Sequence, residues 1–80
     1  MDLGQRLAEI VRRKHNVHPD ELDSLLLQAG FVRRQGRGDH RVYRHPRRVR
    51  PLTIDPRRPA VLSVYVAAVV RAIREVLEDE

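Results

Sequence analysis

Residues 36–46, with the sequence GRGDHRVYRHP, constrain the fold of this chain more than any other stretch. Gly36 and Gly38 are two glycines in three residues, and they give the backbone the freedom that a tight turn requires. The residues that follow alternate between basic and apolar side chains, as in a strand with one buried face, and Pro46 ends the pattern. The stretch therefore predicts a turn that leads into a strand, with His40 where the two meet.

This turn is expected to close an antiparallel hairpin between strands at residues 31–35 and 40–45. A third strand is predicted at residues 49–55, because Leu52 and Ile54 alternate with polar neighbours. Pro51 cannot donate a backbone hydrogen bond, so we expect either an edge position for this third strand or a bulge near its start. The hairpin and the third strand together make a three-stranded antiparallel sheet.

Apolar residues at helical spacing predict three helices. The expected helices are a short one near the N-terminus, a second from Pro19 to a cap at Gly30, and a third from Ser63, its N-cap, to about Leu77. Helices and strands in this order indicate an α+β protein with helices packed on one face of the sheet (α-β-β-β-α) plus an additional N-terminal helix.

Eighty residues are enough for one small domain. We assign residues 1–18 to the N-terminal helical extension and residues 19–77 to the core. Leu62, Val66 and Val70 widen the apolar surface of the third helix beyond what one sheet face covers. We expect the N-terminal helix to cover this extra surface; the alternative is a dimer or a partner protein.

The basic residues are concentrated in the middle of the chain, although the formal net charge is only +5. Ten arginines lie in residues 33–58, together with only two acids, Asp39 and Asp55. The planar guanidinium group matches the geometry of phosphate, so this clustering favours a polyanionic or acidic partner.

Several classes of protein are disfavoured by what the chain lacks. There is no cysteine, and no sulfur or carboxylate side chain is spaced to complete a zinc site with His15 and His18, so neither a metal nor a cofactor is expected. The longest apolar run, residues 64–70, is too short to cross a bilayer, and residues 1–10 lack the apolar core of a signal peptide. We expect a soluble, cytoplasmic protein without a membrane partner.

The segment LLLQAGFVRRQGRGDHRVYRHP, residues 25–46, resembles the HicA family of small toxins. In that family a helix ending in AGF precedes a Gly-Ser-His turn and a strand ending in YRHP. The resemblance continues more loosely through PLTID and SVYVAAVVRAIREV, residues 51–55 and 63–76. It implies a fold like the double-stranded RNA-binding domain (dsRBD). It also implies that the chain is an mRNA interferase, an endonuclease that is the toxin of a type II toxin–antitoxin pair and binds a HicB-like antitoxin.

The same resemblance implies that His40 is the catalytic residue. An ordinary imidazole has a pKa near 6.5, which suits a base that deprotonates the ribose 2′-hydroxyl of RNA; hydrolysis by an activated water is the alternative. A scheme in which His45 acts together with His40 is disfavoured, because an odd separation along a strand places the two side chains on opposite faces. Tyr43 matches the family motif and is expected to be a half-buried sheet residue rather than an RNA contact. The expected RNA-binding residues are the arginines that surround His40: Arg37, Arg41, Arg44, Arg47 and Arg48.

Asp39 stands where the family has serine, directly before the candidate catalytic residue. A carboxylate at this position repels an incoming phosphate unless it orients the imidazole of His40. The alternative function is therefore a catalytically weak or inactive RNA-binding module of the same fold.

Overall fold

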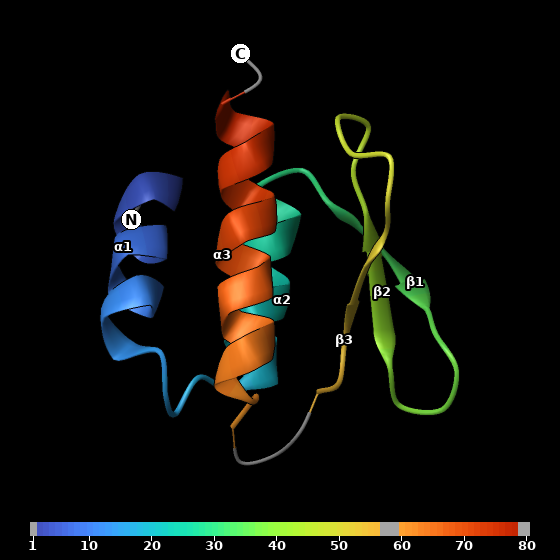
Figure 1. Ribbon diagram of the computed structural model, residues 1–80, viewed down its shortest axis with the longest axis horizontal. Coiled ribbons are helices and arrows are strands. Elements are labelled where there is room, and N and C mark those ends of the chain that lie inside the picture. Colours follow the sequence, from blue (N-terminus) through green and yellow to red (C-terminus); the bar gives the residue numbers. More distant parts are fainter. Residues whose placement is uncertain (1, 57–59, 79–80) are drawn as a thin grey trace.

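The structure is a computed structural model that describes residues 2–56 and 60–78. Along the chain the elements are α1 (Leu3–Arg13), α2 (Pro19–Gln28), β1 (Val32–Gln35), β2 (Arg41–Arg44), β3 (Leu52–Ile54) and α3 (Ser63–Glu78). The strands form one antiparallel sheet in the order β1-β2-β3. Figure 1 shows the sheet on one side of α2 and α3, with α1 on the other side of these two helices. The predicted α+β class, with helices on one face of the sheet, is confirmed.

The first helix is fixed at both of its ends by local hydrogen bonds. Asp2 is the N-cap and forms a capping box with Gln5, in which each side chain accepts a hydrogen bond from the other residue's N–H. At the C-terminal end Lys14 has a φ of +55°, and its neighbour His15 donates a hydrogen bond to the carbonyl of Arg13. This three-residue turn ends α1, and α2 begins at Pro19.

The second helix begins at an unusual cap. His18 accepts a hydrogen bond at Nδ1 from the N–H of Asp20, 3.1 Å away, and Pro19 occupies the first helical position. At the other end the N–H groups of Gly30 and Phe31 donate to carbonyls of the last turn, and Gly30 has a φ of +95°. This is the Schellman arrangement, so the predicted glycine cap at Gly30 is confirmed.

The predicted starts of the third helix and the third strand need correction. The carbonyl of Leu62 accepts hydrogen bonds from Tyr65 and Val66, which makes Ser63 the first helical residue and not the N-cap. Residues 49–51 do not belong to the third strand, which starts at Leu52. Pro51 has no N–H for the ladder, and Val49 is 96% exposed. As predicted, the strand lies at an edge of the sheet.

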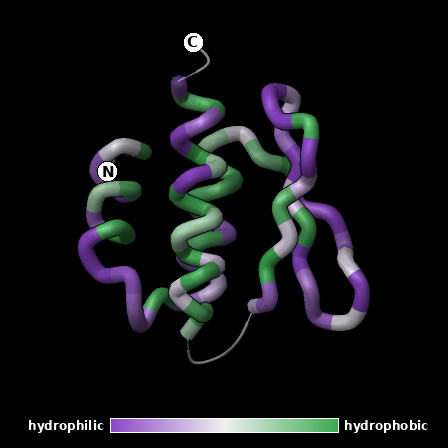
Figure 2. Tube along the Cα trace, viewed as in Figure 1, coloured by the Kyte–Doolittle hydropathy of each residue, from purple (hydrophilic) through white to green (hydrophobic). Residues whose placement is uncertain are grey.

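The core lies between the sheet and the helices and extends to α1. It contains aliphatic side chains together with one phenylalanine and one tyrosine: Leu7, Ile10, Val17, Leu22, Leu25, Leu26, Phe31, Tyr43, Leu52, Ile54, Val61, Val66, Val69, Val70, Ala72, Ile73 and Val76. Figure 2 shows that hydrophobic segments gather in the helices and that the hairpin of β1 and β2 is mostly hydrophilic. Burial of these side chains is the main favourable contribution to folding.

Helix α1 covers part of the wide apolar surface of α3, as the sequence predicted. It packs against both α2 and α3, and Val66 and Val70 of α3 are 2% and 8% exposed. Arg13 of α1 donates to Glu21 of α2 over 2.6 Å, and this hydrogen bond lowers the pKa of the Glu21 carboxyl. Leu62 stays 43% exposed, so α1 leaves some of this apolar surface uncovered.

A hydrogen-bonded group built on Asp23 joins the sheet to α2. The hydroxyl of Tyr43, in the central strand, donates to Oδ1 of Asp23 over 2.6 Å. Arg33 of β1 donates to the same oxygen over 3.1 Å. Tyr43 is only 1% exposed, and burial, together with its bond to Asp23, raises the pKa of its hydroxyl to about 12. One carboxylate thus fixes the position of two neighbouring strands against the helix.

Replacing Tyr43 by phenylalanine tests this contact between the sheet and α2. Tyr43→Phe should lower the free energy of unfolding at pH 7 by about 2 kcal/mol, because a hydrogen bond to a charged group is lost. In the folded wild type the pKa is raised from near 10 to about 12. The stability that this shift contributes is therefore complete below pH 10 and is lost as the pH rises to 12. Urea unfolding at intervals from pH 8 to 12 should show this loss in the wild type and not in Tyr43→Phe.

The matched control is Tyr65→Phe, which removes the hydroxyl of the partly buried Tyr65 instead. This variant should keep the loss of stability between pH 10 and pH 12. An identical pH dependence for the wild type and Tyr43→Phe would show that the hydroxyl of Tyr43 does not hold the sheet.

Candidate functional site

The turn between β1 and β2 fixes the main chain of His40 on both sides. Its N–H donates to the carbonyl of Arg37 over 3.0 Å, and its carbonyl accepts from the N–H of Gly36 over 3.1 Å. Gly38 has a φ of +56° at the first central position of the turn, where type II′ geometry favours glycine. A Cβ on Gly36 would lie 2.6 Å from the carbonyl oxygen of His40, so only glycine fits there. The geometry of the turn therefore explains why both of these positions are glycine.

The side chain of His40 is accessible to a ligand. The residue is exposed, and among residues 2–56 and 60–78 its imidazole has no hydrogen bond or ion pair. Arg41 and Tyr43 face the helices, so alternation along β2 places His40 on the opposite, outer face of the sheet. His40 therefore lies where the turn meets the strand, as predicted, and is exposed there.

Three side chains of this outer face form a diagonal row. In the hairpin register Arg34 lies opposite Val42, and Val32 lies opposite Arg44. His40 continues the register opposite Gly36, which makes Arg34 a diagonal neighbour of both His40 and Arg44. Diagonal neighbours are about 7–8 Å apart at Cα, within reach of long side chains. Arg34 and Arg44 are exposed, and neither forms an ion pair within the part of the chain that the structure describes.

Arg41 belongs to the opposite face. Its guanidinium lies 3.5 Å from Oδ1 of Asp20 in α2, and its side chain is only 22% exposed. Tyr43, on the same face, is a sheet residue as predicted, but it is fully buried at 1% exposure and not half-buried. Of the arginines predicted to surround His40, Arg41 is therefore separated from it by the thickness of the sheet.

Arg47 and Arg48 lie at the far end of β2 from His40. Figure 1 shows the β1–β2 turn and the β2–β3 connection at opposite ends of the sheet. Arg48 pairs with Glu75 of α3 over 3.2 Å, and Arg47 donates to the carbonyl of Val76 over 3.0 Å. A cation at the last carbonyls of a helix stabilises its C-terminus. These two arginines thus hold the loop against α3.

His45 has a structural role. The N–H of Arg47 donates to its Nδ1 over 3.0 Å, which leaves Nε2 to donate to the carbonyl of Ala29, 3.2 Å away. Its ring packs against Phe31 with centroids 4.9 Å apart. These contacts lie on the helix side of the sheet, whereas continued alternation along β2 places His40 on the outer side.

Two further residues of the turn remain beside His40. Arg37 and Asp39 are both exposed, and neither forms an ion pair within the described part of the chain. The carboxylate of Asp39 makes no hydrogen bond to the imidazole of His40 there. Asp39 therefore does not orient that ring, and its charge faces solvent at the mouth of the turn.

Arg34 is the one functional candidate that the motif did not indicate. It precedes the turn in sequence, and only the hairpin register places it next to His40. The signal that could have found it is the alternation of β1 combined with the position of the Gly36 turn. Within the described residues no group of three or more histidine, aspartate or glutamate side chains is arranged to hold a metal. No helix in that part of the chain is long and apolar enough to cross a membrane.

Comparison with known proteins gives no relative for this chain: no protein-family model, no curated protein and no solved structure matches it.

Proposed function

We propose that the chain is an mRNA interferase, an RNA endonuclease that is the toxin of a type II toxin–antitoxin pair, as its resemblance to the HicA family implies. The observation that carries the proposal is the position of His40. Its main chain is held by hydrogen bonds to Arg37 and Gly36, and its imidazole, which has no partner among the described residues, is on the face that carries Arg34. A titratable group on a rigid element beside a cation is what cleavage next to a phosphate requires.

In the proposed reaction His40 acts first as a base. The imidazole takes the proton of a ribose 2′-hydroxyl, and the 2′-oxygen forms a bond to the adjacent phosphorus. The bond from phosphorus to the 5′-oxygen then breaks, and that oxygen receives a proton from the imidazolium. The products are a 2′,3′-cyclic phosphate and a 5′-hydroxyl end. DNA lacks the attacking hydroxyl, which restricts the reaction to RNA.

The arginines of the outer face stabilise the negative charge of the phosphate during the proposed reaction. Arg34 is a diagonal neighbour of His40 in the register and Arg37 belongs to the same turn, so they stabilise the charge that develops on the phosphoryl oxygens. Arg44, one diagonal step beyond Arg34, holds a neighbouring phosphate. Arg41, Arg47 and Arg48 are held by contacts to the helices, and we assign them to the scaffold.

The proposed partner is a HicB-like antitoxin that covers the outer face of the sheet. A carboxylate-bearing surface on the antitoxin complements Arg34, Arg37 and Arg44 and prevents RNA from reaching His40. Because messenger RNA is the substrate, we place this action in the cytoplasm.

An RNA-binding module without catalysis is the second candidate, and Asp39 is the observation that favours it. Its carboxylate lies next to His40 without hydrogen-bonding to the imidazole, so it repels the phosphate without assisting the base. Cleavage and binding must therefore be measured separately.

Replacing His40 by glutamine separates these two functions. His40→Gln should lower the single-turnover rate of RNA cleavage by about 100-fold to 10,000-fold, the usual contribution of a general base. RNA affinity should change by less than about twofold, because most of the affinity comes from arginine–phosphate contacts. Cleavage of a labelled transcript at saturating protein gives the rate, and a filter-binding assay gives the affinity.

The matched control is His15→Gln, at another exposed histidine far from the sheet. This variant should cleave at the wild-type rate. If His40→Gln also cleaves at that rate, His40 is not the base; if the wild type binds RNA but never cleaves it, the binding module is the correct function.

Replacing Arg34 by glutamine tests the cation that the register revealed. Arg34→Gln should weaken RNA binding and reduce the slope of log affinity against log salt by about 0.7, the value for one lost phosphate contact on a single strand. Arg12→Gln removes the same charge from an exposed position on α1 and should leave the slope unchanged. Equal slopes for the two variants would show that RNA does not contact the outer face at Arg34.

A further inference from the structure

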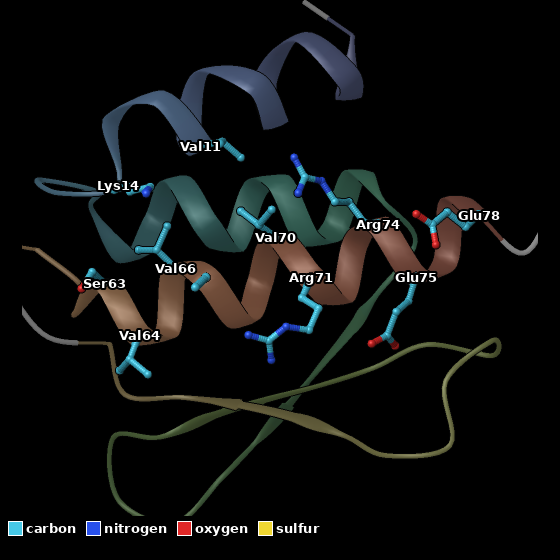
Figure 3. A pocket seen from close by; sticks show the side chains of 11 residues that line it. Val11, Lys14, Ser63, Val64, Val66, Val70, Arg71, Arg74, Glu75 and Glu78 are labelled. Atoms are coloured by element: carbon cyan, nitrogen blue, oxygen red, sulfur yellow. The ribbon is translucent and has the colours of Figure 1, made fainter.

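A groove with an apolar floor runs along α3 on the side of α1. Its volume is about 650 Å³, and Figure 3 shows Val66 and Val70 of α3 pointing towards α1 and Val11. Val64, which also lines the groove, is 68% exposed, and Ala67 is exposed as well. The short helix α1 therefore covers the inner edge of this valine surface and leaves the rest uncovered.

Cations flank the apolar strip on both sides. Figure 3 shows Arg74 pointing towards α1, near whose end Lys14 lies, and Arg71 pointing the opposite way. All three side chains are exposed, and none forms an ion pair with another residue that the structure describes. Among the residues that the structure describes, no acid is paired with these three positive charges of the groove.

The acids of the groove do not cancel this charge. Glu75 pairs with Arg48, 3.2 Å away in the β2–β3 connection. Glu78 lies at the last turn of α3 and closes one end of the groove. Among the described residues that line the groove, Lys14, Arg71 and Arg74 are therefore left without a paired acid on either side of the valines.

We propose that this groove binds an acidic amphipathic helix of a partner protein. The apolar face of that helix packs on Val11, Val66 and Val70, and its carboxylates pair with Lys14, Arg71 and Arg74. Apolar residues flanked by acids on both sides are the pattern that complements this surface. Docking of an amphipathic helix in an apolar groove is a common mode of recognition.

The shape of the groove favours a helix over a small molecule. The lining residues extend from Ser63 to Glu78, over the whole of α3, which is about 24 Å long at 1.5 Å per residue. Most of them are exposed, so the groove is shallow, whereas pockets for small ligands enclose most of the ligand's surface. A partner helix of about four turns matches this length.

This site is separate from the proposed RNA face. Figure 1 shows α1, which borders the groove, and the sheet on opposite sides of α2 and α3, and His40 is on the outer side of that sheet. The inference therefore does not rest on the proposed function, and a partner docked in the groove leaves the RNA face open.

The test uses two labelled helical peptides of about four turns and measures their binding by fluorescence anisotropy. Both carry leucines along one face; the first has glutamates on either side of the leucines, and the second has lysines there. The acidic peptide should bind the wild-type protein at least tenfold more tightly than the basic peptide. Equal affinities, or no binding of the acidic peptide, would overturn the proposal.

A charge reversal shows where the peptide binds. Arg71→Glu combined with Arg74→Glu should reverse the preference, so that the basic peptide binds more tightly. The control, Arg12→Glu combined with Arg50→Glu, makes the same change in net charge at exposed residues outside the groove and should keep the preference for the acidic peptide. Circular dichroism checks that both double variants are folded. An unchanged preference in the variant with Arg71→Glu and Arg74→Glu, the groove variant, would mean that the peptide binds elsewhere.

Two further measurements distinguish other occupants. Decanoate, a small anionic amphiphile, should neither raise the melting temperature nor displace the acidic peptide; if it does both, the groove is a small-molecule site. Light scattering should show the same molecular mass for the wild type and the groove variant. A wild-type dimer that the groove variant loses would identify the occupant as a second copy of the chain. Either result would overturn the proposal of a partner helix.

Discussion

The alternation of side chains along the central strand determines both what holds this protein together and what it presents to a ligand. Tyr43 faces the helices, where its hydroxyl meets Asp23, and this contact fixes which residues of β2 face inwards. His40 and Arg44 consequently face outwards. A slip of one residue in the hairpin would bury these polar groups and expose the tyrosine. The buried hydroxyl that stabilises the sheet is therefore also what keeps the candidate catalytic residue accessible.

The same alternation divides the arginines into two groups with different roles. Inward-facing Arg33 and Arg41 pair with Asp23 and Asp20 of α2, which makes them part of the joint between sheet and helix. Outward-facing Arg34 and Arg44 have no acid opposite them in the sheet. Surface ion pairs contribute little to stability, so the inward pairs serve mainly to orient side chains. The outward arginines retain their charge for a ligand, and phosphate is the group that this charge and geometry suit.

Much of the architecture was readable from the sequence because each element carries a local signal. Periodic apolar residues mark the helices, Gly30 marks the end of α2, and the glycine turn marks the hairpin. The errors arose where tertiary structure decides. Residues 49–51 of the β2–β3 connection were predicted as strand, although Pro51 and the contacts of Arg47 and Arg48 with α3 hold them in a loop. The arginines were predicted as a single field around His40, because clustering in sequence carries no information about which face of a sheet each side chain occupies.

The central claim is that the outer face of the sheet cleaves RNA through the 2′-hydroxyl, with His40 as the base. The most direct measurement first maps a cleavage position in a transcript treated with the purified protein. It then compares an oligonucleotide that spans this position with a copy in which the one ribose before the cleaved bond is 2′-deoxyribose. The all-ribose substrate should yield a 2′,3′-cyclic phosphate end, and the substituted one should stay intact at that bond. Equal cleavage of the two substrates, or no cleavage of any RNA, would contradict the claim.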